Sequence, residues 1–159
     1  MILVMLGTQK NSFKRLLEEI EKCINKGIIN EEVVVQAGGT KYKSEKMKIF
    51  DLIPNEKLTN YMEKANFIIC HGGVGSIVSS IKLGKKVIAI PRYEKYGEHV
   101  NNHQEQIVNS FSKQGLIIGT ENVCELENAI SKVGDFEPRK FVSNTENVIN
   151  IVSDYIDNN

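Results

Sequence analysis

The chain carries the stretch Phe67-Ile68-Ile69-Cys70-His71-Gly72-Gly73-Val74-Gly75-Ser76, in which an apolar run leads into a glycine-rich turn. A helical pattern of apolar residues follows, through Ile77, Val78, Ile81 and Leu83. A buried strand, a glycine turn and a helix in this order bring the free N–H groups of the first helical turn to one point. The helix dipole adds roughly half a positive charge there. The stretch therefore predicts a site for a phosphate-bearing ligand.

Short β-rich runs and helix-period segments alternate on both sides of this stretch. The residues predict strands at Ile2–Leu6, Val33–Gln36, Lys48–Leu52, Asn66–Cys70, Val87–Ile90 and Leu116–Ile118. They predict helices at Phe13–Asn25, Glu56–Lys64, Ser76–Leu83, Val100–Lys113, Cys124–Lys132 and Arg139–Ile156. Asn55 stands where a helix N-cap belongs, and Gly84 stands just past a helix, as a C′ residue does. The alternation predicts one doubly wound α/β domain over residues 1–159, with a mostly parallel, Rossmann-like sheet.

The composition fits a globular domain and excludes several classes of protein. Of the 159 residues 41% are hydrophobic and 25% charged, and 20 basic residues balance 20 acidic ones. Without an excess of basic residues, nucleic acid is not an expected partner. No apolar run approaches the roughly 20 residues that a membrane helix needs. The three cysteines, Cys23, Cys70 and Cys124, are odd in number and far apart, which favours a reducing cytoplasm.

Unusual residues follow four of the predicted strands. They stand at Gly7–Gln9, Gln36–Gly39, His71–Ser76 and Pro91–Tyr93. In a doubly wound sheet, ligands bind beyond the carboxyl ends of the strands, where the strand order reverses. The glycine turn lacks the Gly-Lys-Ser/Thr of a Walker A loop and the spacing of a dinucleotide fingerprint. Close packing of a helix on a strand is the alternative explanation of its glycines.

The polar segment Pro91–Gln106 leads into the helix that follows the fifth predicted strand. Amide and imidazole side chains at the start of that helix suit hydrogen bonds to sugar hydroxyls and phosphate oxygens. A solvated helix start is the alternative. His99 and His103 stand four apart and could join His71 in a zinc site, but the Glu of H-E-x-x-H is missing. Cys70, at the end of a buried strand, is expected to be a core residue.

Together these segments resemble the C-terminal, donor-binding half of the family 28 glycosyltransferases, which have the GT-B architecture. The likeness rests on Met5–Thr8, Cys70–Ser76, Gly84–Arg92 and Gly97–Gln104, and it covers nearly the whole chain. The chain looks like the small stand-alone catalytic subunits of bacterial capsular and exopolysaccharide synthesis. These subunits are similar to the catalytic subunit of the eukaryotic GlcNAc transferase that forms lipid-linked chitobiose.

The resemblance implies a GT-B enzyme, a hexosyltransferase, split over two chains. This chain would bind a UDP-sugar, either UDP-glucose, UDP-galactose, UDP-GlcNAc or UDP-glucuronate. A membrane-associated partner would supply the other half, recruit a polyprenyl-diphosphate-linked acceptor and bring this chain to the cytoplasmic face of the membrane. The last predicted helix, about 139–156, is rich in apolar residues; it is expected to dock on the core, with a contact to the partner as the alternative.

The resemblance also assigns roles to individual residues. On the donor side it implies Gly72, Gly73, Gly75 and Ser76 at the diphosphate, His103 and Gln104 at the transferred sugar or the diphosphate, and Arg92 and Asn102 beside them. Gly7 and Thr8 would line the cleft toward the acceptor. The family often has an acidic residue three positions after the Ser of the turn, where it holds the ribose. Here Ser79 stands at that position, and a hydroxyl makes a weaker contact than a carboxylate.

The expected reaction inverts the anomeric carbon without a covalent intermediate. Backbone N–H groups and helix N-termini would stabilise the charge on the departing UDP, so no metal or other cofactor is expected. His71 is the candidate base, with a structural hydrogen bond as its alternative role, and a base on the partner is the other alternative. A UDP-sugar epimerase and a non-catalytic nucleotide-sugar-binding or regulatory subunit are the competing functions.

Overall fold

Six parallel strands form one sheet in the order β3-β2-β1-β4-β5-β6. The structure, a computed structural model, describes residues 1–142. The strands are β1 (Ile2–Met5), β2 (Val33–Gln36), β3 (Lys48–Phe50), β4 (Phe67–His71), β5 (Val87–Ile90) and β6 (Ile118–Gly119). Every neighbouring pair is parallel. The predicted doubly wound parallel sheet is therefore confirmed.

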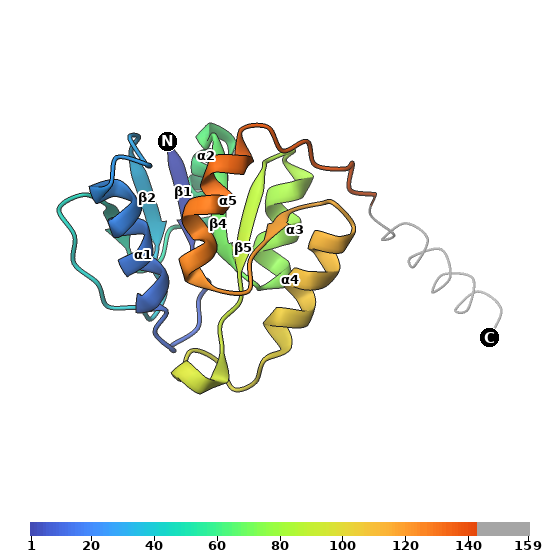
Figure 1. Ribbon diagram of the computed structural model, residues 1–159. Helices are drawn as coiled ribbons and strands as arrows, with labels where there is room; N and C mark the ends of the chain where they lie inside the picture. The colour runs from blue at the N-terminus through green and yellow to red at the C-terminus, as the bar shows by residue number, and fades with distance from the viewer. Residues whose placement is uncertain (143–159) are drawn as a thin grey trace, which may run out of the picture.

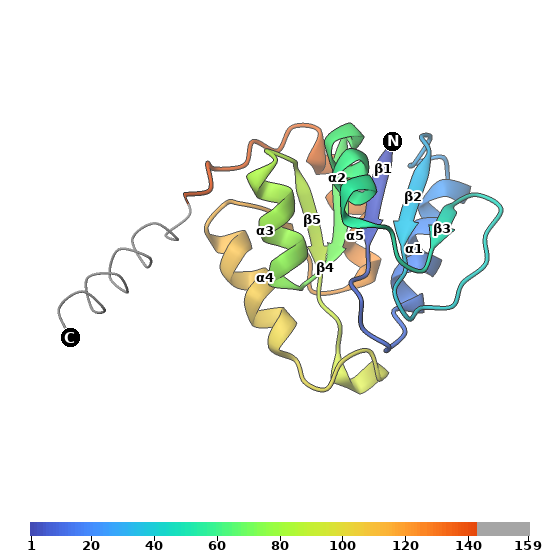
Figure 2. The same ribbon diagram turned by 180° about the vertical axis from the view of Figure 1, so that it is seen from behind.

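Helices cover both faces of this sheet. They are α1 (Lys14–Asn25), α2 (Asn55–Lys64), α3 (Val74–Lys82), α4 (His103–Lys113) and α5 (Leu126–Val133), with the short 3-10 helices η1 (Glu94–Tyr96) and η2 (Val123–Glu125). Helices α1 and α5 lie on the face toward the viewer in Figure 1, and α2, α3 and α4 lie on the face seen in Figure 2. Each face has its own apolar core, so the sheet is buried on both sides.

Strand residues contribute alternately to the two cores. In β1, Ile2 and Val4 belong to the core under α1 and α5, whereas Leu3 and Met5 belong to the core under α2, α3 and α4. This alternation is the period of two that a strand imposes on its side chains. Because both sets are apolar, the strand is continuously apolar in sequence.

The element boundaries differ from the predicted ones at several points. Helix α4 begins at His103 and not at Val100, because residues 94–102 form η1 and a loop of turns and bends. Pro54, and not Asn55, occupies the N-cap position of α2. Gly84 has a φ of 69°, as expected of a C′ residue. Residues 139–142 are not helical, and the rest of the predicted helix Arg139–Ile156 lies outside the described residues. Among residues 1–142, no helix has the length and apolar character needed to span a bilayer.

Candidate functional site

The strand order reverses between β1 and β4, at the centre of the sheet. Strands β2 and β3 lie on one side of this pair, and β5 and β6 lie on the other. The loops after β1, β4 and β5 come together at the carboxyl edge, the lower edge of the sheet in Figure 1. Ligands of doubly wound folds bind at such a reversal point. The glycine turn of Gly72–Gly75, which follows β4, lies at this point.

Helix α3 starts at this point without a cap. Its N-cap residue is Gly73, and no side chain hydrogen bonds to the helix start. The backbone N–H of Ile77 is the first that bonds within the helix, to the carbonyl of Gly73 at 3.1 Å. The N–H groups of the three residues between them, Val74–Ser76, therefore have no intrahelical acceptor. A Cβ added to Gly75 would meet nothing within 4 Å, and unbonded N–H groups at a helix start suit an anion.

The ring of His71 is wedged between the loop after β1 and the start of α3. His71 is 7% exposed, and its Nδ1 lies 3.3 Å from the carbonyl oxygen of Met5. A Cβ on Gly7 would lie 2.7 Å from Cε1 of the ring, and a Cβ on Gly73 would overlap Nε2. Gly7 also has a φ of 78°, which favours glycine. Both glycines are therefore required by the histidine, whether or not a ligand is bound.

His71 is neutral at physiological pH. Burial lowers its pKa to about 4, the nearby Arg92 and His99 lower it slightly further, and the Met5 carbonyl opposes the shift. Since a carbonyl only accepts, Nδ1 carries the proton in this hydrogen bond and Nε2 keeps its lone pair. A base with so low a pKa draws protons weakly at neutral pH. The structural hydrogen bond expected as the alternative role is present, and a catalytic role remains a prediction.

The glycines of the turn have different neighbours. A Cβ on Gly72 would lie 2.9 Å from the Cβ of Gln104 and 2.9 Å from Cγ2 of Val108. Gly72 therefore lets α4 pack closely, as Gly73 makes room for His71, and both fit the packing explanation raised from the sequence. Gly75 differs, because it is exposed and has free space around it. Of the three predicted glycines, Gly75 is the one that packing in the structure does not require, and its place at the diphosphate stays a prediction.

The serines of α3 are partly used by the helix itself. Ser79 donates its hydroxyl proton to the Gly75 carbonyl at 2.8 Å, and Ser80 donates to the Ser76 carbonyl at 2.7 Å. Ser80 is buried, whereas Ser79 is exposed and Ser76 half-buried. The oxygen of Ser79 can still accept a hydrogen bond from a ligand hydroxyl. Its proton is not free for the ribose contact that the sequence suggested.

Arg92 does not face the open edge, contrary to its predicted role in donor binding. Its side chain is fully buried, and its guanidinium donates to the carbonyls of Leu6 at 2.6 Å, Asn11 at 2.8 Å and Glu98 at 3.2 Å. The group also lies 4.9 Å from the centre of the Phe13 ring. Burial lowers the pKa of Arg92 to about 10, so the group keeps its charge at neutral pH. Arg92 joins two loops and has no free face for a ligand.

The three polar residues at the start of α4 also differ from one another. Gln104 is buried, and its Oε1 accepts a hydrogen bond from the Arg92 backbone N–H at 3.1 Å. Asn102 is exposed, and its Oδ1 accepts from the N–H of Glu94 at 3.0 Å. His103 is exposed, with Nδ1 3.3 Å from Oε1 of Gln106. The structure thus leaves His103 accessible and uses Gln104 to hold the loop.

The histidines do not form the zinc site considered from the sequence. His99 precedes α4, so it does not share a helix face with His103. Within residues 1–142, no group of three His, Cys, Asp or Glu side chains has the geometry to hold a metal ion. Cys70 is fully buried, and burial raises the pKa of its thiol to about 12. It is a core residue, as expected.

A hollow lies beside the loop after β1, in which Gly7 and Thr8 were predicted to line a cleft. It measures about 510 Å³ and is lined by Thr8, Gln36, Leu52, Ile53, Pro54, Asn55 and Leu58. Thr8 is exposed there, and Leu52 after β3 is 62% exposed. The part of the hollow formed by Leu52 and Ile53 was not predicted. The signal in the sequence was this apolar pair directly before a proline, but the predicted strand Lys48–Leu52 included Leu52. This hollow extends the carboxyl edge from β1 toward β3.

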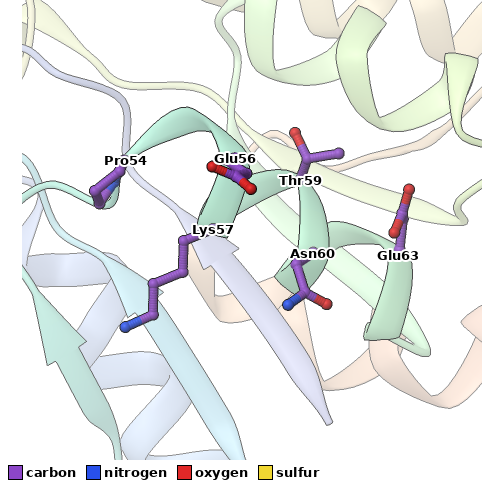
Figure 3. Close-up of a pocket in the computed structure, with 6 residues that line it drawn as sticks. All are labelled: Pro54, Glu56, Lys57, Thr59, Asn60 and Glu63. Carbon is purple, nitrogen blue, oxygen red and sulfur yellow. The ribbon is translucent and has the colours of Figure 1, made fainter.

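A larger hollow lies along α2, away from the start of α3. It measures about 730 Å³, and its lining residues are Pro54, Glu56, Lys57, Thr59, Asn60 and Glu63 (Figure 3). All of them belong to α2 or directly precede it. Except for Pro54, none lines the hollow at the carboxyl edge. The candidate site is therefore the edge formed by Gly7, Thr8 and the start of α3.

Sequence comparisons match the whole described chain to one family. Residues 1–158 match the model of the glycosyltransferase family 28 C-terminal domain. The chain is 27% identical over 134 residues to the UDP-N-acetylglucosamine transferase subunit ALG13 of Candida glabrata, covering 82% of this chain and 64% of that protein. It is 23% identical over 124 residues to the Debaryomyces hansenii subunit of the same name, covering 76% and 56%. The chain thus spans less than two thirds of the length of these relatives.

Solved structures with the same fold include a glycosyltransferase and ALG13. The glycotransferase of kitacinnamycin aligns with a TM-score of 0.61 at 17% identity, over 83% of this chain and 34% of that one. The NMR solution structure of ALG13 aligns with a TM-score of 0.54 at 17% identity, over 89% of both chains. At these identities the structures show a common fold. Together with the family match over residues 1–158, they show that the chain belongs to the family of glycosyltransferase family 28 C-terminal domains.

Proposed function

We propose that this chain is the donor-binding, catalytic subunit of a glycosyltransferase and that it binds the diphosphate of a UDP-sugar at the start of α3. One observation carries the proposal. In a chain of family 28, the N–H groups of Val74–Ser76 have neither a side-chain cap nor an intrahelical acceptor at the reversal point of the sheet, and a Cβ on Gly75 among them would meet nothing within 4 Å. Such groups bind phosphate oxygens through hydrogen bonds and the helix dipole without any cation.

The proposed reaction is direct displacement with inversion at the anomeric carbon. An acceptor hydroxyl attacks that carbon and gives its proton to a base, the bond to the diphosphate breaks, and UDP leaves with the bonding electrons. The N–H groups of α3 stabilise the negative charge that develops on the leaving group. No metal ion is required in this scheme. His71, with its Nδ1 proton directed at the Met5 carbonyl and its Nε2 unprotonated, is the candidate base on this chain.

The acceptor half of the enzyme is assigned to a second chain. The relatives from Candida glabrata and Debaryomyces hansenii carry the name "subunit", which supports an enzyme built from more than one chain. We propose a membrane-associated partner that presents a polyprenyl-diphosphate-linked sugar at the cytoplasmic face of the membrane. Capsular or exopolysaccharide synthesis is the proposed setting.

UDP-GlcNAc is the proposed donor. The names of the same relatives specify a UDP-N-acetylglucosamine transferase, and this places UDP-GlcNAc ahead of UDP-glucose, UDP-galactose and UDP-glucuronate. Radiolabelled forms of all four are incubated with membranes that contain this chain and its co-expressed partner. We expect label in the lipid fraction from UDP-GlcNAc, and none from membranes that lack this chain. Absence of transfer from all four donors with both chains present contradicts the proposal.

A non-catalytic regulatory role, in which the chain binds a partner but has lost its affinity for UDP, is the second candidate. It is favoured by Ser79, whose hydroxyl proton is directed into its own helix and which replaces a carboxylate at the ribose position. Titration of the purified chain with UDP separates the two functions, because a subunit that has lost its donor site gives no binding heat. Incubation with UDP-GlcNAc alone tests for an epimerase, which forms product without acceptor or partner.

A further inference from the structure

Two loops that flank the start of α3 are tied together by buried charges. One loop, residues 7–13, follows β1, and the other, residues 91–102, follows β5. Three residues join them: Arg15 from the first turn of α1, and Arg92 and Glu98 from the loop after β5. We call these three residues the loop clamp. It brings together segments that lie side by side at the carboxyl edge in Figures 1 and 2.

Glu98 is the acceptor at the centre of the loop clamp. Its side chain is 4% exposed. Its two carboxylate oxygens accept from Nε and Nη2 of Arg15, each at 2.9 Å, in the bidentate geometry that suits a guanidinium. Oε2 also accepts from the backbone N–H of Tyr93 at 3.1 Å. One buried carboxylate thus fixes both α1 and the beginning of its own loop.

Arg92 and Asn11 add bonds between the same two loops. Arg92 donates to carbonyls at the end of β1 and in the first loop, those of Leu6 and Asn11, and to the Glu98 carbonyl in the second. In the opposite direction, Nδ2 of Asn11 donates to the carbonyl of Gly97 at 2.9 Å. Removing Glu98 therefore leaves the hydrogen bonds of Arg92 and Asn11 to backbone carbonyls in place, but it takes away the only carboxylate of the loop clamp.

The charge balance makes Glu98 hard to replace. The loop clamp holds two guanidinium groups and one carboxylate, all buried or half-buried. Among the described residues, Nη1 of Arg15 and Nε of Arg92 already lack an acceptor, so the loss of Glu98 would add further unpaired donors to the same cluster. A lysine at position 15 would keep the charge but lose the fork and the stacking on Tyr96, whose ring centre lies 4.5 Å away.

The loop clamp is connected to both sides of the candidate site. The first loop contains Gly7, against which the His71 ring packs. The second loop runs into α4, where Gln104 accepts from the Arg92 N–H and packs on Gly72. A shift of either loop would therefore move the walls on both sides of the start of α3.

We infer that Glu98 is a positioning residue, which locks the loop after β5 onto the loop after β1 and so presents the start of α4 to the donor sugar. This inference rests on the proposed function for its last step. Glu98 touches neither the diphosphate nor the reacting atoms in this scheme. It acts through the loop that carries Asn102 and His103.

Hydrogen exchange of the full chain without ligand tests whether Glu98 holds the two loops together. We compare wild type with Glu98→Gln and with Glu127→Gln, which breaks the exposed ion pair between Lys26 and Glu127. In Glu98→Gln we expect exchange to rise by about tenfold in both loops, because hydrogen bonds to a charged group are lost. Protection in β2 and β4 stays at the wild-type level. Equal loosening of the whole sheet, a change in only one loop, or no change at all overturns the inference.

Binding measurements test the effect on the donor. Calorimetry with UDP and with UDP-GlcNAc gives the ratio of the two affinities for each variant. We expect Glu98→Gln to keep the affinity for UDP within about twofold and to lose most of the additional affinity for UDP-GlcNAc. An unchanged ratio overturns the positioning role. If Glu98→Gln does not fold, Arg15→Lys is measured instead. We expect it to keep its affinity for UDP and to lose a smaller part of the additional affinity for UDP-GlcNAc.

The two experiments separate this inference from the proposed function. If wild type binds neither UDP nor UDP-GlcNAc, the proposed function fails together with the last step of the inference, while hydrogen exchange still decides whether Glu98 locks the loops. If wild type binds both and Glu98→Gln behaves like Glu127→Gln, the proposed function stands and the positioning role fails.

Discussion

Glycines in the turn after β4 serve different purposes at the residue scale. Gly73 makes room for the ring of His71, and Gly75 lies beside open space. The sequence placed the turn at the right point of the fold, because a glycine-rich segment after a buried strand is easily recognised. It could not separate the glycines, because the atoms that face each one come from residues distant in sequence, such as Gln104 at Gly72.

Replacing Gly73 with alanine tests the packing of the histidine. The backbone of Gly73, with φ −82° and ψ 127°, is open to alanine, so any cost comes from overlap with the His71 ring. We expect Gly73→Ala to lower the free energy of unfolding by about 1–3 kcal/mol. In a His71→Ala background the loss should be much smaller. Urea unfolding of the four proteins in this double-mutant cycle measures both values; an equal loss in both backgrounds contradicts the packing described here.

The buried neutral state of His71 makes the free energy of unfolding depend on pH. The pKa of His71 is lowered to about 4 in the folded protein, from an ordinary value of 6.5. Between these values the unfolded chain binds more protons than the folded one, so stability rises with pH and is lost as pH falls. Between about pH 7.5 and about pH 5, we expect wild type to lose about 2 kcal/mol more than His71→Asn. Urea unfolding of both proteins at each pH measures the difference. Equal losses of unfolding free energy in the two proteins would show that the His71 ring is exposed to water, which contradicts its burial.

At the scale of elements, the sequence predicted the interior of each strand and helix better than its ends. The apolar run of β5 has the predicted bounds, because a fully buried strand has a strong pattern. The start of α4 was misplaced because the loop before it is held by Glu98 and Arg92, which read as exposed polar residues in the sequence. The donor-binding role of Arg92 came from the family resemblance, and the sequence alone could not show that its guanidinium bonds to backbone carbonyls of two loops.

Helix α1 depends on a hydroxyl from another element. The N–H of its N-cap residue, Phe13, donates to Oγ1 of Thr40 at 2.9 Å, and Thr40 is buried in the loop after β2. Thr40→Val keeps the shape but leaves that N–H without an acceptor. We expect it to lower the free energy of unfolding by about 1–3 kcal/mol. Thr40→Ser, which keeps the hydroxyl, should cost much less; urea unfolding of both variants measures this, and similar losses would show that the methyl group matters more.

For the whole molecule, the strand order decides where chemistry can occur. The order 3-2-1-4-5-6 places β1 and β4 at the centre, so the loop with Gly7 and the start of α3 face each other across the reversal point. The sequence predicted this edge because the alternation of strands and helices implies parallel strands, whose carboxyl ends share one side. The packing of the loops decides which residues are buried at this edge. Loop packing leaves no periodic pattern in the sequence, so these residues could not be predicted.

The central claim is that the amides at the start of α3 hold the donor diphosphate, and the most direct test is calorimetric titration of UDP into wild type, Gly75→Asp and Gly134→Asp. A Cβ meets nothing within 4 Å at either glycine, so both variants add a carboxylate to open space. Gly75→Asp should fold at least as stably as wild type, because aspartate suits a first helical turn and replaces glycine.

We expect Gly75→Asp to weaken UDP binding by about tenfold or more through repulsion of the diphosphate, and Gly134→Asp to bind as wild type does. Wild-type affinity for UDP in a folded Gly75→Asp variant would contradict the claim.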